Sequence, residues 1–175
     1  MVERDYFQLF GLEQQFLIDT ELLRQRYIAL QAKCHPDKFV GKTSMEKRLA
    51  IQTATQINDG YQILQDPISR AKYLAQKYAI NFDKESTYQA DSDFLMHQMA
   101  LREALEELDA DSIELQEYQQ NLQNKINEYY ETLSQIFLAA GTNSAIDSAH
   151  LKQAIFELQF YQKIMKDFSV KFSHS

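Results

Sequence analysis

The chain contains few residues that end helices or form tight turns, with only 4 glycines and 2 prolines among 175 residues. A β-sandwich or β-barrel needs frequent turns, whereas long helices joined by a few connections need little of either residue. Hydrophobic residues make up 45% of the sequence, which suffices for a buried core and excludes a disordered chain. The sequence therefore predicts an all-α protein.

Apolar residues recur three and four positions apart along most of the chain, which is the spacing of one helix face. The first long example comprises Leu23, Tyr27, Leu30 and Cys34. Pro36 ends that helix, because the residue before a proline avoids the helical region. These patterns and their candidate caps predict helices over 5–10, 20–35, 44–65, 67–79, 91–108, 112–139 and 144–168.

A polar segment without helical period, residues 81–91, predicts a linker between two helical halves, 1–80 and 92–175. The first half contains a helical hairpin with short flanking helices. The second half contains three longer helices joined by short turns, which predict an antiparallel three-helix bundle. Ser44 is a candidate cap, and Gly141 is placed to end a helix in the left-handed conformation.

The charge balance separates the two halves and excludes several classes of protein. Residues 1–75 carry 10 basic and 9 acidic side chains, whereas residues 76–175 carry 8 and 16. The net charge of −7 argues against a nucleic-acid-binding protein.

The single cysteine, Cys34, cannot form an internal disulfide or a cysteine-based zinc site. No apolar run approaches the ~20 residues of a membrane span, and the start lacks the pattern of a signal peptide. We therefore expect a protein of the bacterial cytoplasm.

The loop between the two helices of the hairpin reads His35-Pro36-Asp37. Taken alone, this tripeptide is typical of a capping turn. Metal binding is disfavoured, because no second cysteine exists and His97 is distant in sequence. A nucleophilic Cys34–His35 pair is disfavoured as well, because adjacent residues at a helix end point apart. The sequence gives no further support for an enzyme that uses His35 and Asp37, since it has no glycine-rich phosphate loop.

The surroundings of the tripeptide resemble the J-domain family, the DnaJ-like co-chaperones of heat-shock-seventy-type ATPases. The matching segments are Asp5-Tyr6-Phe7, Leu9-Phe10-Gly11-Leu12, Ile57-Asn58, Tyr61, Leu64, Asp66-Pro67, Arg70-Ala71 and Tyr73-Leu74. The resemblance covers about residues 1–75 and implies a hairpin whose tip contacts the ATPase and biases it toward ATP hydrolysis, without bond chemistry of its own. The tip carboxylate can pair with an arginine of the partner, and the basic helix face can dock an acidic groove. The implied contact residues are His35, Pro36, Asp37, Arg24, Arg26, Lys33 and Lys38.

The fifth predicted helix carries more apolar residues than one core-facing stripe can use. Leu95, Met96 and Met99 lie off that stripe; the two methionines are about 140° and 160° from Leu101. One interpretation is that they pack under the first half or the linker. The other is an exposed, adaptable patch for a protein partner. The stripe itself comprises Phe94, Leu101, Leu105 and Leu108.

A second resemblance covers the whole chain and is to the J-domain proteins of iron–sulfur cluster assembly (HscB-like). It rests on Phe94-Leu95-Met96, Gln98, Leu101-Arg102-Glu103 and Leu105-Glu106-Glu107, on the hairpin-loop spelling His35-Pro36-Asp37-Lys38-Phe39, on the length and on the helical C-terminal half. The sequence departs from the family at Ala100 and Ala104, where members often have acids. The implied scaffold contacts are Leu95, Met96, Met99, Glu103, Glu107 and Phe160.

The second resemblance implies a non-enzymatic co-chaperone with two partners, an iron–sulfur scaffold protein (IscU-like) and a dedicated heat-shock-seventy-type ATPase (HscA-like). It implies no cofactor, no metal site, no nucleic acid and no membrane partner. A J-domain co-chaperone for a different client is the alternative. It would be favoured if the Leu95, Met96 and Met99 side chains were buried.

Overall fold

The computed structural model describes residues 5–34, 38, 41–82, 90–109, 112–141 and 145–173. These residues form helices and no strand, which confirms the all-α fold class. None of the described helices is long and apolar enough to span a membrane. The chain divides into two compact units, Met1–Ala79 and Ile80–Ser175. The exact boundaries of the predicted linker stay a prediction, because residues 83–89 lie outside the described residues.

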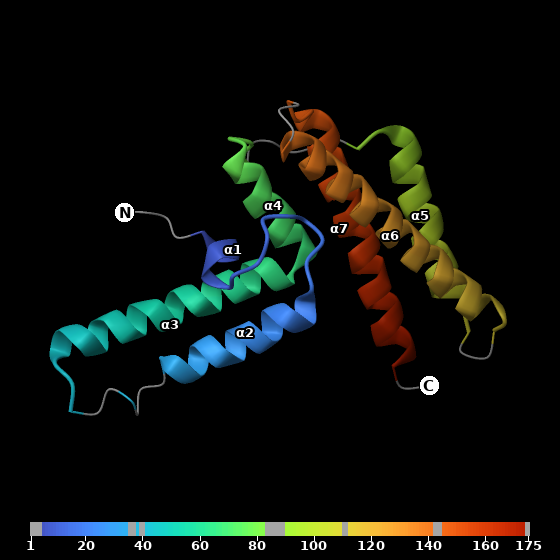
Figure 1. Ribbon diagram of the computed structural model, residues 1–175. Helices are drawn as coiled ribbons and strands as arrows, with labels where there is room; N and C mark the ends of the chain where they lie inside the picture. The colour runs from blue at the N-terminus through green and yellow to red at the C-terminus, as the bar shows by residue number, and fades with distance from the viewer. Residues whose placement is uncertain are drawn as a thin grey trace. The chain divides into compact units, whose positions relative to one another are not determined.

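The first unit is built on a hairpin of two helices, α2 (Thr20–Lys33) and α3 (Ser44–Gln65), with α1 (Tyr6–Leu9) and α4 (Pro67–Lys77) against α3 (Figure 1). Leu23 and Ile57 are fully buried between the helices of the hairpin. The rings of Tyr27 and Tyr61 stack with centroids 4.1 Å apart, which fixes the register of α2 on α3.

A glycine of α3 allows α1 to approach closely. A Cβ atom at Gly60 would lie 2.6 Å from Cδ1 of Tyr6 and 3.1 Å from Cε2 of Phe10. The Tyr73 hydroxyl on α4 accepts a hydrogen bond from the backbone N–H of Tyr6 over 3.0 Å. The aromatic residues of α1 therefore join α3 and α4 into one core.

The second unit is a bundle of three helices, α5 (Ser92–Glu107), α6 (Glu114–Gly141) and α7 (Ser148–Phe172) (Figure 1). Consecutive helices α6 and α7 share most of the core, in which Leu122, Leu133 and Leu158 are fully buried. The core includes the carboxylate of Glu157, which accepts hydrogen bonds from the Tyr129 hydroxyl (2.6 Å) and the Gln153 amide (3.0 Å). Burial and the bond to Glu157 raise the pKa of Tyr129 above its ordinary value. A buried carboxylate is tolerated here because its oxygens are hydrogen-bonded.

Several helix ends differ from the sequence prediction. Thr43 caps α3 in place of Ser44, because its hydroxyl accepts from the N–H of Glu46 while the Glu46 carboxylate accepts from the N–H of Thr43. Gly141 is the last residue of α6 and is not in the left-handed conformation, which was expected there. The last helix begins at Ser148 with Asp147 as its cap and runs to Phe172.

Candidate partner-binding sites

The basic side chains predicted to meet an ATPase lie mostly at the surface of the first unit. Arg24 and Lys33 are exposed on α2, and Lys38 is exposed beyond its end. The Arg24 guanidinium also donates from Nε to the Glu21 carboxylate over 3.2 Å. The tip residues of the motif lie outside the described residues: His35, Pro36 and Asp37.

Arg26 has a structural role within the first unit. Its side chain is half-buried, and Nη1 donates to the carbonyl oxygen of Phe10 over 2.6 Å and to that of Gly11. These bonds tie the segment that follows α1 to α2. The guanidinium of Arg26 therefore stabilises the fold of the first unit, and its contact with the ATPase stays a prediction.

The off-stripe residues of α5 are exposed. The exposed fractions are 48% for Leu95, 61% for Met96 and 63% for Met99, and Glu103 and Glu107 are exposed farther along the helix. These five residues are called the α5 face below. Within the second unit, therefore, neither α6 nor α7 covers these three large apolar side chains, as a partner surface requires.

The start of α5 explains why these side chains point outward. Asp91 caps the helix by accepting a hydrogen bond from the N–H of Phe94 over 2.7 Å. The Phe94 ring then inserts among aromatic rings of α7, with centroids 6.2 Å from Phe156 and 5.7 Å from Phe160. Because successive helix residues are rotated by about 100°, fixing Phe94 inward leaves the next two positions outside.

Phe160 supports the α5 face instead of forming part of its surface. Its side chain is only 7% exposed. Its ring meets Phe94 edge to face, and the guanidinium carbon of Arg102 lies 5.8 Å from its centroid. The implied scaffold contact of Phe160 stays a prediction, and the structure places this ring against Phe94 beneath α5.

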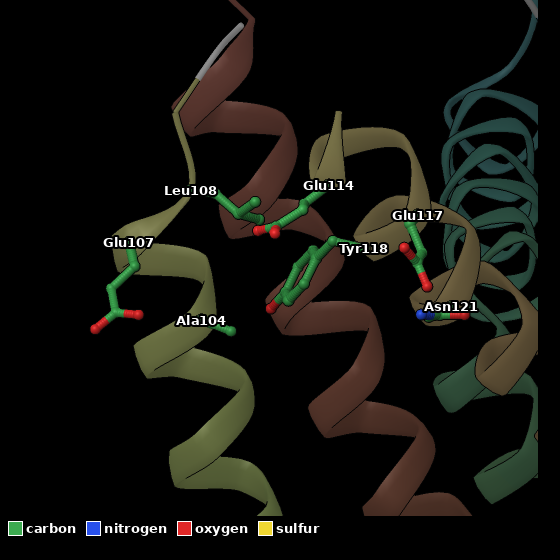
Figure 2. A pocket seen from close by; sticks show the side chains of 7 residues that line it. All are labelled: Ala104, Glu107, Leu108, Glu114, Glu117, Tyr118 and Asn121. Carbon is green, nitrogen blue, oxygen red and sulfur yellow. The ribbon is translucent and has the colours of Figure 1, made fainter. Parts of the chain in front are cut away.

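A pocket of about 310 Å³ lies where the C-terminal end of α5 meets the start of α6 (Figure 2). Nothing in the sequence indicated this cavity. Tyr118 points across toward α5, and its hydroxyl donates to the carbonyl oxygen of Leu101 over 2.7 Å. Burial raises the pKa of Tyr118 to about 12. The pocket is lined by Ala104, Glu107, Leu108, Glu114, Glu117, Tyr118 and Asn121.

Metal-binding and nucleophilic sites find no support in the described part of the chain. No group of three or more histidine, cysteine, aspartate or glutamate side chains is arranged there to hold a metal ion. Cys34 is half-buried at the end of α2, where its backbone N–H caps the helix. The described residues do offer two candidate surfaces, exposed basic residues on the first unit and an apolar and acidic face on the second.

Known protein families match both units. Residues 5–73 match the DnaJ domain, and residues 90–168 match the HSCB C-terminal oligomerisation domain. The chain is 37% identical over 164 residues to the Co-chaperone protein HscB homolog of Shewanella loihica, which covers 93% of this chain and 94% of the relative. The chain belongs to the HscB family of co-chaperones. It is also 41% identical over 162 residues to the HscB homolog of Shewanella sp. strain W3-18-1, with coverage of 91% and 92%.

Solved structures of HscB proteins are similar to this chain over nearly its whole length. Chaperone HscB from Vibrio cholerae superposes with a TM-score of 0.83 at 31% identity, covering 98% of this chain and 99% of that one. Human co-chaperone protein HscB gives a TM-score of 0.80 at 27% identity, covering 98% and 83%. The resemblances to J-domain and HscB-like proteins found in the sequence are thereby confirmed.

Proposed function

We propose that this HscB-family chain binds an iron–sulfur scaffold protein, delivers it to a dedicated heat-shock-seventy-type ATPase and stimulates that ATPase. This activity belongs to iron–sulfur cluster assembly in the bacterial cytoplasm, and the chain itself catalyses no bond chemistry. The observation that carries the proposal is the α5 face. Three large apolar side chains, Leu95, Met96 and Met99, are exposed on a helix of the unit that matches the HscB family.

The α5 face has the composition of a surface for a protein client. Leu95, Met96 and Met99 supply apolar area, and methionine adapts its shape to a partner because its side chain is unbranched and flexible. Glu103 and Glu107 extend the face with negative charge, which favours a scaffold surface with basic residues beside an apolar patch. Phe160 holds α5 in place from beneath and contributes indirectly.

The first unit supplies the ATPase contact in this proposal. The tip His35-Pro36-Asp37 presents an imidazole and a carboxylate, and the carboxylate can pair with an arginine of the ATPase. Arg24, Lys33 and Lys38 attract an acidic groove, and Arg26 keeps the unit folded. The contact shifts the ATPase toward its hydrolysing state through differential binding of its conformations. Since exposed charges are screened beyond ~8 Å at physiological ionic strength, association with the ATPase should slow as salt is added.

Three variants of the full chain test the two contacts separately. Asp37→Asn should abolish ATPase stimulation and leave calorimetric titration with the scaffold unchanged. His35→Gln should behave in the same way. The triple variant Leu95→Ala, Met96→Ala, Met99→Ala should lose scaffold affinity and keep the stimulation measured without scaffold.

The results of these assays also decide between clients. If the wild-type chain stimulates the ATPase but does not bind the scaffold, the chain is a J-domain co-chaperone for a different client. If Asp37→Asn unfolds the first unit, as judged by circular dichroism, the tripeptide is a structural capping turn and the ATPase contact must lie elsewhere.

A further inference from the structure

Helix α5 carries the proposed client surface but is sparingly buried in its own bundle. Of its 16 residues only Leu105 is buried, whereas α7 buries residues along its whole length. At its N-terminal end α5 is held by Phe94 among aromatic rings, and Nε2 of His97 lies 3.0 Å from the Tyr161 hydroxyl. At the C-terminal end the buried side chains are those of Leu105 and Leu108, and a further attachment holds the backbone there.

That attachment comes from the last turn of α7. The Lys171 ammonium donates to three carbonyl oxygens at the end of α5: Leu105 over 2.7 Å, Glu106 over 2.9 Å and Leu108 over 2.9 Å. An ammonium group has three N–H donors, so all three are used here. The last carbonyls of a helix have no partner within the helix, and they carry the negative end of its dipole. One cation from a distant segment thus caps α5.

Side-chain packing against α6 is weak at the same place, although Leu105 and Leu108 are buried. The pocket between α5 and α6 interrupts their contact from Ala104 to Leu108, and in Figure 2 the Glu107 side chain points away from Tyr118. The Tyr118 hydroxyl reaches α5 one turn earlier, at the carbonyl oxygen of Leu101. The final turn of α5 therefore depends on Lys171 more than on side-chain packing against α6.

We propose that Lys171 is a positioning residue for client binding. Its ammonium fixes the acidic end of the α5 face, at Glu103 and Glu107, although Lys171 contributes nothing to that face. Without the charge, the last turn of α5 separates from α7 more often and the two carboxylates no longer hold one position. The client part of this inference rests on the proposed function, whereas the attachment of α5 does not.

Hydrogen exchange of the full chain tests the attachment without any partner. Lys171→Met keeps most of the length of the unbranched side chain and removes its charge. We expect the amides at the end of α5 to exchange about fivefold faster or more, since a cation at a helix C-terminus stabilises it by that order, while Leu122 and Leu133 of α6 keep their rates. Lys171→Arg keeps the charge and should retain most of the protection. Lys166→Met, an exposed lysine of α7, is the matched control and should change nothing at α5.

Three results would overturn the attachment: unchanged exchange in α5, equal acceleration throughout the bundle, or equal loss of protection in Lys171→Arg and Lys171→Met. Titration with the scaffold protein then tests the positioning role. Lys171→Met should weaken binding several-fold, Lys166→Met should not, and both should stimulate the ATPase normally without scaffold. Faster exchange with unchanged scaffold affinity would refute the positioning role and leave the proposed function intact. A wild-type chain that does not bind the scaffold would refute the proposed function and the positioning role, while the exchange data would still decide the attachment.

Discussion

Truncation of Phe160 should affect the fold, and truncation of the residues above it should affect binding. Phe160 is 7% exposed, with the Phe94 and Tyr161 rings at 5.7 Å and 5.3 Å. Replacing a buried phenylalanine by alanine costs about 3–5 kcal/mol. In a unit of roughly 100 residues each kcal/mol lowers the melting temperature by about 4–8 °C. Phe160→Ala should therefore lower the melting temperature of the second unit by about 12 °C or more.

The triple variant of Leu95, Met96 and Met99 should give the opposite pattern. These side chains are 48–63% exposed, so their removal leaves the core intact and the melting temperature nearly unchanged. Truncating an anchor residue of an interface to alanine lowers the binding free energy by more than ~1 kcal/mol. Each ~1.4 kcal/mol of binding free energy changes the dissociation constant tenfold. Truncation of three anchors should therefore lower the scaffold affinity by about a hundredfold.

The assay combines thermal melts followed by circular dichroism with calorimetric titration of the scaffold. Hydrogen exchange assigns each melting transition to one unit of the chain. A wild-type melting temperature for Phe160→Ala would contradict the assignment of this ring to the core. The reasoning fails equally if the triple variant loses as much thermal stability as Phe160→Ala and keeps its affinity, because the α5 face would then be core.

Three further variants test single contacts. Arg26→Ala should lower the free energy of unfolding of the first unit by about 1–3 kcal/mol in denaturant titration, because it removes two hydrogen bonds, whereas Arg24→Ala should cost less than ~0.5 kcal/mol. Gly60→Ala should destabilise the same unit by about 1–3 kcal/mol, since its Cβ would lie 2.6 Å from Tyr6, and a wild-type melting temperature would refute this. Folding raises the pKa of Tyr118 to about 12, so the folded state keeps a proton that the unfolded state loses from about pH 10. The free energy of unfolding should fall from pH 10 to 12, and less steeply in Tyr118→Phe.

The helices could be predicted because their signals are local. Apolar spacing placed all of them, and Asp66 with Pro67 marked the start of α4, where Asp66 accepts from the N–H of Ser69. The start of α3 was predicted at the right residue, but its cap was assigned to Ser44 although the sequence contains the signal for Thr43, a threonine followed three positions later by a glutamate. Gly141 was overinterpreted, because a glycine after an apolar stripe can also be the last helical residue.

The α5 face could be predicted from one helix alone, whereas its supports could not. Leu95, Met96 and Met99 stand out because a helix at the edge of a bundle buries only one stripe. Phe160 could not be placed in this way, because α7 is buried on several sides and its period does not tell which neighbour covers which residue. Lys171 gave no signal either, because its carbonyl partners lie 63–66 residues earlier in the chain.

The apolar residues of α5 have to serve two purposes, and this limits how the helix can be held. Each large side chain placed on the α5 face is unavailable for the seam with α7, so the seam relies on Phe94, Leu105 and Leu108. Burial alone would fix a helix of this length through several more residues. Backbone carbonyls compensate, because they are present whatever the side chains are. By capping α5 through those carbonyls, Lys171 stabilises the helix end without using any position that the client surface needs.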